Sequence, residues 1–509
     1  MGQGIIKYCT IRFSRNRHLH TAAIRREQAQ EQIHHKNFYI DGAWTDPASN
    51  KIIDVIGANT GQSIGSVPDG SEADIDRAVA AARRALAAGW ADSEPSCRAA
   101  ILNKFADALA KRGERLCRSV SMQNGMPLAL ATAYEGEYVV GLIKYYAALA
   151  ESLVTEERRS SPLGFDTLVR KKPVGVVGGI VPWNYPVVLS MMKIGPALAT
   201  GCTLVLKPSP GTVLDCYVVA EAAEEAGIPP GVINWVPGGR EVGAYLVSHP
   251  DIDKVAFTGS TAAGRKIGEV CGRLLRPVSL ELGGKSAGIV LDDVKVEHLV
   301  EGMMFGSFAN NGQTCAISTR MLVPASRYDE IVDAIASFAS GLKVGNSLDM
   351  STQIGPLASS EHRDRVESYI AKGKTEGRVV AGGGRPKGLD AGWFVEPTVF
   401  ADVDNSATIA QEEIFGPVLS IIKYGSDDEA VKIANDSEFG LGGTVYSSDS
   451  QRAQDIARRV QTGTIGVNGY VIDLAAPFGG IKASGLGREM GPESLAAYQQ
   501  LQSVYLPNG

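Results

Sequence analysis

Short apolar runs alternate with amphipathic stretches along this 509-residue chain. The run at 174–181 is continuous, which is typical of a strand buried on both faces of a parallel sheet, and further strands are expected at 203–206, 254–257 and 277–282. Between and before them, apolar positions recur at helical spacing, as at Ile75, Val79, Ala82 and Leu86. This alternation predicts a doubly wound α/β sheet whose ligand lies beyond the carboxyl ends of the strands.

A second α/β region is expected after Gly284. Strands are predicted at 286–291 and 320–323, and helices at about 296–308, 328–342 and 360–376. The segment 153–172 alternates weakly and is charged, so it predicts either a projecting two-stranded arm or an irregular surface loop. The C-terminal strand expected at 503–506 is a candidate partner for such an arm.

The composition indicates a soluble globular protein. Hydrophobic residues make up 44% and charged residues 21%, and the net charge is −6. The basic residues are scattered, which argues against nucleic acid as the main partner. Seven cysteines occur without a CxxC pair or a Cys/His cluster, so we expect a reducing compartment and no metal. No apolar run reaches membrane-spanning length without a charge, so no membrane segment is predicted.

The N-terminus is basic. Residues 1–26 contain six Lys or Arg and no acid, as mitochondrial transit peptides do. A disordered extension, or a start site placed too far upstream, explains the same residues. A cytoplasmic location is expected, with the mitochondrial matrix as the alternative.

Candidate chemistry lies where the predicted strands end. Residues 258–264 follow a strand and open a helix with Gly259, Ser260 and Gly264, an arrangement that can hold a pyrophosphate on unpaired N–H groups. Taken alone, the two glycines fit a plain tight turn equally well. Cys315 follows small, polar and glycine residues, where a nucleophile can meet a substrate. Taken alone, it also fits a buried, inert thiol.

Seven short motifs, which follow one another along the chain, distinguish between the alternatives for residues 258–264 and for Cys315. They are PWNYP (182–186), KPSP (207–210), FTGSTAAG (257–264), LELGGKS (280–286), NNGQTC (310–315), EEIFGP (412–417) and FGGIKASGLGRE (478–489). Together they closely resemble the aldehyde dehydrogenase superfamily over about residues 37–507. The resemblance implies an N-terminal extension (1–36), a Rossmann-like dinucleotide-binding domain (37–151 and 173–283), a catalytic α/β domain (284–489) and a small β oligomerisation arm (152–172 and 490–509).

The resemblance also implies how the aldehyde is oxidised. Cys315 would be the nucleophile, Asn184 its oxyanion partner and Glu281 the general base that activates water against a thioester. Lys193 and Glu489 would form a proton path from Glu281. The expected product is a carboxylic acid.

Cofactor and substrate residues follow in the same way. Trp183 and Ser260, with Gly259 and Gly264, would bind the pyrophosphate, Lys207 the adenine ribose, and Glu413 and Phe415 the nicotinamide end. NAD-preferring relatives often carry a Glu where this chain has Pro210, so NAD is expected and NADP stays possible. The substrate tunnel would be lined by Tyr185, Leu189, Met192, Ile317, Tyr470, Ile472 and Phe478.

This apolar, aromatic lining favours a medium-sized apolar or aromatic aldehyde. Three other functions fit part of the pattern: a CoA-acylating relative, a non-catalytic structural protein that keeps the fold, and a cofactor-free thiol esterase. Glu281 favours water over CoA, and the cofactor motifs disfavour the esterase. A homodimer or homotetramer is expected, with the arm and the C-terminal strand crossing between subunits.

Overall fold

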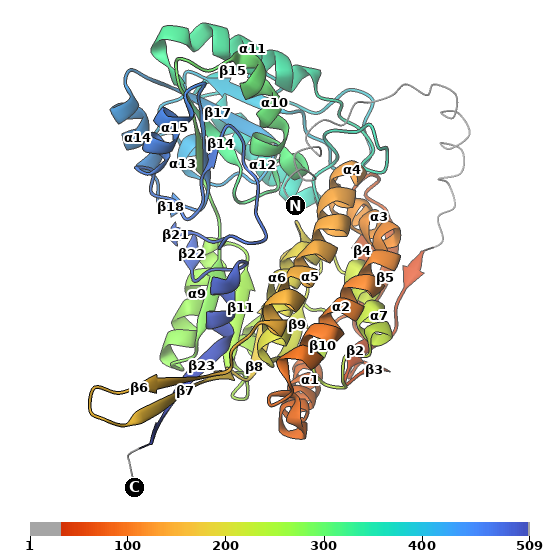
Figure 1. Ribbon diagram of the computed structural model, residues 1–509. Helices are drawn as coiled ribbons and strands as arrows, with labels where there is room; N and C mark the ends of the chain where they lie inside the picture. The colour runs from red at the N-terminus through yellow and green to blue at the C-terminus, as the bar shows by residue number, and fades with distance from the viewer. Residues whose placement is uncertain (1–31, 507–509) are drawn as a thin grey trace.

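The computed structural model describes residues 32–506, in two lobes with a projecting arm (Figure 1). Residues 1–31 of the expected N-terminal extension lie outside the described residues, and Ile33–His34 already forms strand β1. Strand β1 joins β5 (Ser63–Pro68) and β4 (Ile52–Ile56) in a small sheet that the sequence did not predict.

The first lobe is built on an eight-stranded sheet. Its order is β22 (Gly485–Leu486), β12 (Val278–Glu281), β11 (Lys254–Thr258), β8 (Val176–Ile180), β9 (Thr203–Lys207), β10 (Ile233–Trp235), β2 (Phe38–Ile40) and β3 (Ala43–Thr45). The five central strands are parallel, as predicted, and the edges are antiparallel. Strand β22 lies within the range expected for the catalytic domain, yet it pairs with β12 of this sheet.

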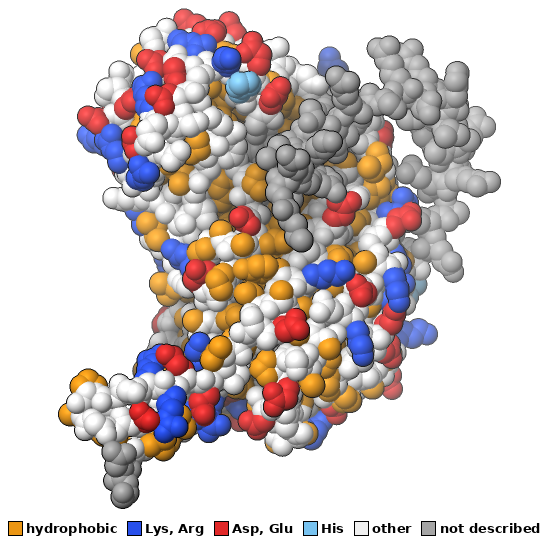
Figure 2. Space-filling view, viewed as in Figure 1, with side chains coloured by type: hydrophobic (Ala, Val, Ile, Leu, Met, Phe, Trp, Pro, Cys, Tyr) orange, Lys and Arg blue, Asp and Glu red, His pale blue; other side chains and the backbone are white. Residues whose placement is uncertain are grey.

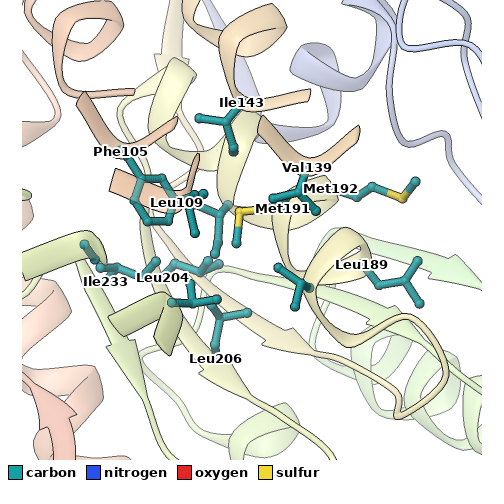
Figure 3. Packing of buried hydrophobic residues seen from close by; sticks show 14 of the residues in the cluster. Phe105, Leu109, Val139, Ile143, Leu189, Met191, Met192, Leu204, Leu206 and Ile233 are labelled. Carbon is teal, nitrogen blue, oxygen red and sulfur yellow. The ribbon is translucent and has the colours of Figure 1, made fainter. Parts of the chain in front are cut away.

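Helices cover both faces of this sheet, because successive strand residues point to opposite sides. On β9, Leu204 and Leu206 face one core cluster, and Val205 faces the other. The helices of this lobe are α1 (Glu72–Ala85), α2 (Pro95–Lys111), α3 (Gly113–Asn124), α4 (Leu128–Ala131), α5 (Val139–Glu151), α6 (Pro186–Thr200), α7 (Leu214–Ala226), α8 (Arg240–Ser248) and α9 (Thr261–Arg273). The larger cluster packs beneath helices α2, α5, α6 and α7 (Figure 3).

The second lobe repeats this layered architecture. Its seven-stranded sheet has the order β15 (Arg378–Ala381), β16 (Thr398–Ala401), β17 (Val418–Tyr424), β14 (Ser318–Pro324), β13 (Ser286–Val290), β19 (Gly443–Tyr446) and β20 (Gly466–Val467). Helices α10 (Val296–Ser307) and α11 (Tyr328–Gly341) pack on one face. The other face carries α12 (Ser360–Gly373), α13 (Thr408–Gln411), α14 (Asp427–Asn435) and α15 (Ser450–Ala457). A two-stranded ladder, β18 (Phe439–Gly440) with β21 (Ile481–Lys482), lies beside it.

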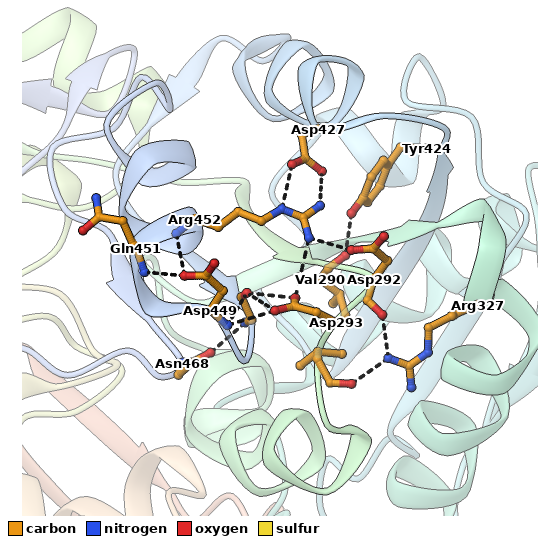
Figure 4. A network of polar contacts seen from close by, with 12 residues as sticks. Val290, Asp292, Asp293, Arg327, Tyr424, Asp427, Asp449, Gln451, Arg452 and Asn468 are labelled. Carbon is orange, nitrogen blue, oxygen red and sulfur yellow. Dashed lines mark hydrogen bonds and ion pairs between the residues drawn. The ribbon is translucent and has the colours of Figure 1, made fainter.

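An ion-pair network fastens the loop after β13 to α14 and α15 (Figure 4). The guanidinium of Arg452 donates to both carboxylate oxygens of Asp427 at 2.9 and 2.8 Å, and to Asp292 at 2.6 Å. A planar guanidinium that meets a carboxylate with two bonds holds a fixed angle as well as a distance. The network therefore fixes the orientation of these helices at the end of the sheet away from the Cys315 loop.

The arm consists of β6 (Glu156–Ser160), β7 (Asp166–Pro173) and β23 (Gln499–Leu506). Strand β23 pairs antiparallel with β7 over eight residue pairs, so the arm is a sheet and the surface-loop alternative is wrong. The side chains of Leu163, Leu501 and Tyr505 are 80%, 71% and 67% exposed. Over the face shown in Figure 2, acidic and basic side chains are mixed, without a region of one sign.

Three local features of the described residues do not follow from the apolar pattern. Helix α2 ends at Lys111 and α3 begins at Gly113, with Arg112 between them. The C-terminal segment from Pro492 forms a 3₁₀-helix, η7 (Pro492–Tyr498), before β23. Residues Thr132–Tyr138 form a π-helix, η4, between α4 and α5, which apolar spacing did not indicate. Within residues 32–506, no helix combines the length and the apolar character needed to cross a membrane.

Candidate active site between the two lobes

The loop that presents Cys315 is held by buried amides. It follows a 3₁₀ turn, η5 (Ala309–Gly312), in which Asn310 and Asn311 have φ angles of 51° and 60°. Asparagine tolerates this left-handed conformation better than most residues. The Asn311 side chain donates to the carbonyls of Gly125 and Pro356, both at 2.9 Å, and accepts from the N–H of Gly355 at 2.7 Å. The nucleophile loop is therefore tied to two distant segments.

Asn184 lies directly against this loop. Its side-chain nitrogen donates to the carbonyl of Gln313 at 3.0 Å. Its own carbonyl accepts from the side chains of Asn124 and Asn310 at 3.0 and 2.9 Å. An amide nitrogen carries two hydrogens, so one remains for a ligand atom at Cys315. The structure brings Asn184 and Cys315 together in the lining of one cavity.

The surroundings of Cys315 keep its side chain protonated. Burial raises the pKa of the thiol above its ordinary value, and the nearby carboxyl groups of Glu413 and Glu281 raise it further. The thiolate is the reactive form of cysteine. The resting site therefore holds a thiol that must lose its proton before it can attack.

Glu281 stands at the carboxyl end of β12 and is almost fully buried. Neither carboxylate oxygen finds a well-aligned hydrogen-bond partner among the described residues. Burial, and then the charge of Glu489, raise the pKa of Glu281 well above its ordinary value, while Lys193 opposes this. An unpaired carboxyl group with a raised pKa is suited to exchanging protons near neutral pH.

Lys193 and Glu489 form a buried ion pair. The Lys193 ammonium lies 2.9 Å from the Glu489 carboxylate, and their side chains are 0% and 3% exposed. Lys193 also donates to the hydroxyl of Thr258 at 2.7 Å. The backbone of Glu489 exchanges two hydrogen bonds with Phe478. This pair therefore differs from an ordinary surface ion pair, and its electrostatic effect reaches Glu281.

A cavity of about 340 Å³ opens from Cys315 toward the end of the first sheet. Five of the seven predicted cofactor residues line it: Trp183, Gly259, Ser260, Glu413 and Phe415. Gly264 instead packs against Leu282, and a Cβ there would lie 2.4 Å from that side chain. Lys207 lies outside the lining and donates to the carbonyl of Gly238 at 2.6 Å. A larger cavity, of 680 Å³, lies between α3 and η4 and contains none of the predicted residues.

The features of this cavity fit a dinucleotide. Ser260 caps α9, accepting from the N–H of Ala263 at 3.3 Å, so the positive helix end faces the cavity. Glu413 accepts from the N–H of Gly284 at 3.0 Å. A Cβ at Gly283 would lie 2.6 Å from the Glu413 carboxylate, so any larger residue there would displace that carboxylate. The rings of Trp183 and Phe415 meet edge to face at 5.4 Å.

Two residues of this wall were missed from the sequence. His362 and Arg365, both on α12, line the cavity. His362 Nε2 bonds the carbonyl of Phe415 at 2.7 Å, and Arg365 donates to the carbonyl of Glu413 at 2.7 Å. Burial lowers the pKa of His362 to about 4, so the ring is neutral and donates this bond. In the sequence, only their i, i+3 spacing on a predicted helix could have marked the two residues, and many residue pairs on helix surfaces share this spacing.

The opposite wall of the site is aromatic and apolar. Six of the seven predicted substrate residues belong to, or pack against, the core cluster that also contacts Cys315: Tyr185, Leu189, Met192, Tyr470, Ile472 and Phe478. Ile317 is buried but lies outside that cluster. The hydroxyl of Tyr185 bonds that of Thr314 at 2.9 Å, and the hydroxyl of Tyr470 bonds that of Thr464 at 2.6 Å.

The π-helix η4 adds two tyrosines to this wall. The ring of Tyr134 meets that of Tyr185 edge to face at 6.2 Å. Tyr138 donates from its hydroxyl to the carbonyl of Ile472 at 3.2 Å. The sequence did not reveal these residues, because no motif marks the segment that carries them.

Comparison with known proteins agrees with this geometry. The model of the aldehyde dehydrogenase family matches residues 44–504. The chain is similar to a geranial dehydrogenase from Castellaniella defragrans, at 60% identity over 93% of this chain and 99% of that protein. It is also similar to the putative aldehyde dehydrogenase DhaS of Bacillus subtilis, at 42% identity over 92% and 95%.

Solved structures give the same result. An aldehyde dehydrogenase of Mycobacterium tuberculosis complexed with NAD+ superposes with a TM-score of 0.92, at 46% identity over 94% of this chain and 99% of that one. Aldehyde dehydrogenase C of Pseudomonas syringae, a mutant complexed with NAD+ and octanal, gives 0.89 at 37% identity over 92% and 96%. With its two α/β lobes, with Cys315 and Asn184 at one cavity, and with a family model that matches residues 44–504, this chain belongs to the aldehyde dehydrogenase family.

Proposed function

We propose that this protein oxidises a neutral, apolar aldehyde to its carboxylic acid with NAD+, through a thioester on Cys315. One observation carries the proposal. Cys315 and the Asn184 amide line one cavity beside an aromatic wall, and the buried Glu281 carboxyl lies close enough to Cys315 to raise the pKa of its thiol. These are the nucleophile, the oxyanion donor and the base that the reaction requires.

In the first half-reaction, the Cys315 thiol loses its proton to solvent water, the thiolate sulfur bonds to the aldehyde carbon, and the carbonyl oxygen takes up negative charge. The Asn184 amide and the Cys315 N–H stabilise that charge in a thiohemiacetal. A bound nicotinamide supplies the hydride acceptor. Glu413 and Phe415 would hold the nicotinamide end of the cofactor, and Trp183 and Ser260, at the start of α9, would hold the pyrophosphate. Loss of hydride from the thiohemiacetal carbon leaves a thioester on Cys315.

In the second half-reaction, Glu281 takes a proton from water, and the resulting hydroxide attacks the thioester carbon. The carbon–sulfur bond breaks, the acid leaves, and Cys315 regains a proton. The buried Lys193–Glu489 pair supports passage of the proton away from Glu281. Because Glu281 gives water a base at the thioester, hydrolysis is favoured over transfer of the acyl group to CoA.

The aromatic wall supports the choice of a neutral substrate. The hydroxyls of Tyr138, Tyr185 and Tyr470 are all bonded to protein groups, which leaves their rings to meet a ligand. The seven predicted wall residues include no charged side chain. Geranial and octanal, named for two similar proteins, are both apolar aldehydes.

NAD+ is preferred to NADP+ in this proposal. Pro210 offers neither a carboxylate to the ribose 2′-hydroxyl nor a positive charge to a 2′-phosphate. Lys207 is buried, and burial lowers its pKa to about 8, which weakens it as a fixed charge for a phosphate. The solved structures cited above contain NAD+.

We further propose a homodimer or homotetramer in which the arm meets another copy of the chain. The exposed side chains of Leu163, Leu501 and Tyr505 support this role. A cytoplasmic location is part of the same proposal, with the mitochondrial matrix as its alternative, because the residues that would decide lie outside those described.

The test is the initial rate of reduced-cofactor formation, with NAD+ and NADP+ in parallel. The substrates are geranial, octanal, benzaldehyde, betaine aldehyde and succinic semialdehyde. We expect turnover of the first three with NAD+, little turnover of the two charged aldehydes, and none in Cys315→Ala. An inactive wild type with every pair, or a fully active Cys315→Ala, contradicts the proposal.

A further inference from the structure

We propose that Glu135, which lies outside the reacting groups, is a positioning residue for the oxyanion site. By accepting two backbone hydrogen bonds at the start of α6, it fixes the turn that carries Asn184 and Tyr185 against the Cys315 loop. This inference rests on the proposed function, but it has a structural readout of its own.

Glu135 is completely buried in η4 and has no contact with solvent. Its Oε2 accepts from the N–H of Val187 at 2.8 Å and of Val188 at 3.1 Å. The first N–H groups of a helix lack partners within the helix, and burial makes an unpaired one costly. Tyr185, the N-cap residue of α6, supplies no side-chain cap. Glu135 therefore provides the cap from a remote segment.

Helix α6 and the residues before it carry several groups of the proposed site. Asn184 lies just before the helix, and Lys193 within it pairs with Glu489. Leu189 and Met192, two of the predicted substrate residues, extend from the same helix (Figure 3). Pro186, with its fixed φ, links Asn184 stiffly to the first turn. A shift of that turn therefore moves the oxyanion donor relative to Cys315.

The π-helix η4 places side chains both at the start of α6 and in the substrate wall. Its wider turn occurs often at functional sites. Glu135 points to the backbone of α6, whereas Tyr134 contacts the ring of Tyr185 and Tyr138 reaches the carbonyl of Ile472. The segment that caps α6 thus also forms part of the substrate wall.

The neighbouring helix shows which property of Glu135 matters. At the start of α7, the side-chain oxygen of Gln123 accepts from the N–H groups of Val213 and Leu214 at 2.7 and 2.9 Å. The neutral side-chain amide of Gln123 thus makes at α7 the same pair of backbone hydrogen bonds that Glu135 makes at α6. Glu135 faces Asp215, Cys117 and Tyr185, and burial with the charge of Asp215 raises its pKa to about 8. The acceptor oxygen, not a negative charge, is the required feature.

The decisive variants are Glu135→Gln, which keeps an acceptor oxygen, and Glu135→Met, which has similar length and no acceptor. Glu135→Asp, which keeps the carboxyl but shortens its reach, serves if Glu135→Met does not fold. Glu137→Met is the matched control, because Glu137 is exposed on the same π-helix. Ile335→Ala, in the core of the other lobe, is the control for general destabilisation.

The first readout is hydrogen exchange at Val187 and Val188, which needs no activity. Exchange should be faster in Glu135→Met and Glu135→Asp, and unchanged in both controls. The second readout is the single-turnover rate of hydride transfer, which should fall about 10- to 100-fold in Glu135→Met. Glu135→Gln should stay within about threefold of wild type, and the dissociation constant of NAD+ should not change.

Unchanged exchange and an unchanged transfer rate in Glu135→Met would overturn the proposal. So would a folded Glu135→Gln as slow as Glu135→Met, since an acceptor would then be insufficient. If wild type is inactive with every aldehyde, the proposed function fails, and the exchange measurement still decides whether Glu135 caps α6.

Discussion

The two walls that meet at Cys315 are built in different ways. The cofactor wall combines glycines and the start of α9 at the ends of strands with the side chains of Trp183, His362, Arg365, Glu413 and Phe415, all exposed to a cavity. The substrate wall consists of side chains from η4, α6 and the 464–478 segment, packed into the core cluster. One wall relies on backbone groups as well as side chains, and the other mainly on side chains.

This difference separates the common chemistry from the choice of substrate. Backbone groups in tight loops tolerate few residue types, so the cofactor wall is restricted to short motifs. The aromatic wall can exchange one ring for another at modest cost, because its rings come from unconnected segments. Substrate preference can therefore change while the cofactor site stays the same.

The largest effect is expected where the two walls meet. Cys315→Ala should reduce the rate of NADH formation by at least about 10,000-fold with every aldehyde, because no covalent intermediate can form. NAD+ should still bind, as measured by protein fluorescence. Cys97→Ala, which changes an exposed cysteine, is the control and should behave as wild type.

Glu281→Gln should separate the two half-reactions. Release of the acid should slow by about 100- to 10,000-fold, while the first burst of NADH stays visible, because hydride transfer precedes the step that needs the base. Rapid mixing with excess aldehyde measures both rates. If the burst of NADH disappears together with the steady-state rate, Glu281 acts before or during hydride transfer.

The same residue gives a pH dependence. The pKa of Glu281 is raised, so the group carries a proton at low pH and becomes a base only as pH increases. In wild type, the rate of acid release should therefore rise with pH as Glu281 loses its proton, at a pH well above that of an ordinary glutamate. In Glu281→Gln that rise should disappear, which a pH series of steady-state rates will reveal.

Glu413→Ala tests the cofactor wall alone. The KM for NAD+ should rise by about 10- to 100-fold, because a carboxylate that bonds the ligand is lost, while the KM for the aldehyde changes little. The adjacent, exposed Glu412, which bonds Tyr369, provides the control Glu412→Ala. Equal increases in both KM values would contradict the separation of the two walls.

Tyr134→Leu tests the substrate wall and should have the smallest effect. Loss of the edge-to-face contact with Tyr185 should raise the KM for benzaldehyde and geranial by about 2- to 10-fold. The KM for NAD+ should stay constant. If only the KM for NAD+ changed, Tyr134 would belong to the cofactor wall and not to the substrate wall.

Much of the fold and of the cofactor wall could be predicted from the sequence. Buried strands read as continuous apolar runs, and the loops after them carry consecutive motif residues such as Gly259 and Ser260. Tyr134 and Tyr138 could not be recognised, because a π-helix differs from an α-helix by one residue per turn and leaves no clear periodic signal. His362 and Arg365 act through contacts across more than forty residues of sequence, which no local pattern encodes.

The position of β22 has a consequence for the synthesis of this chain. The sheet of the first lobe begins at residue 38, but its last strand is Gly485–Leu486, near the end of the chain. A ribosome makes the chain from the N-terminus, and domains generally fold as units in that order. Here the first lobe cannot complete its sheet until nearly all of the second lobe has been made. During translation, β12 therefore remains an open sheet edge, available to a chaperone or to a neighbouring nascent chain.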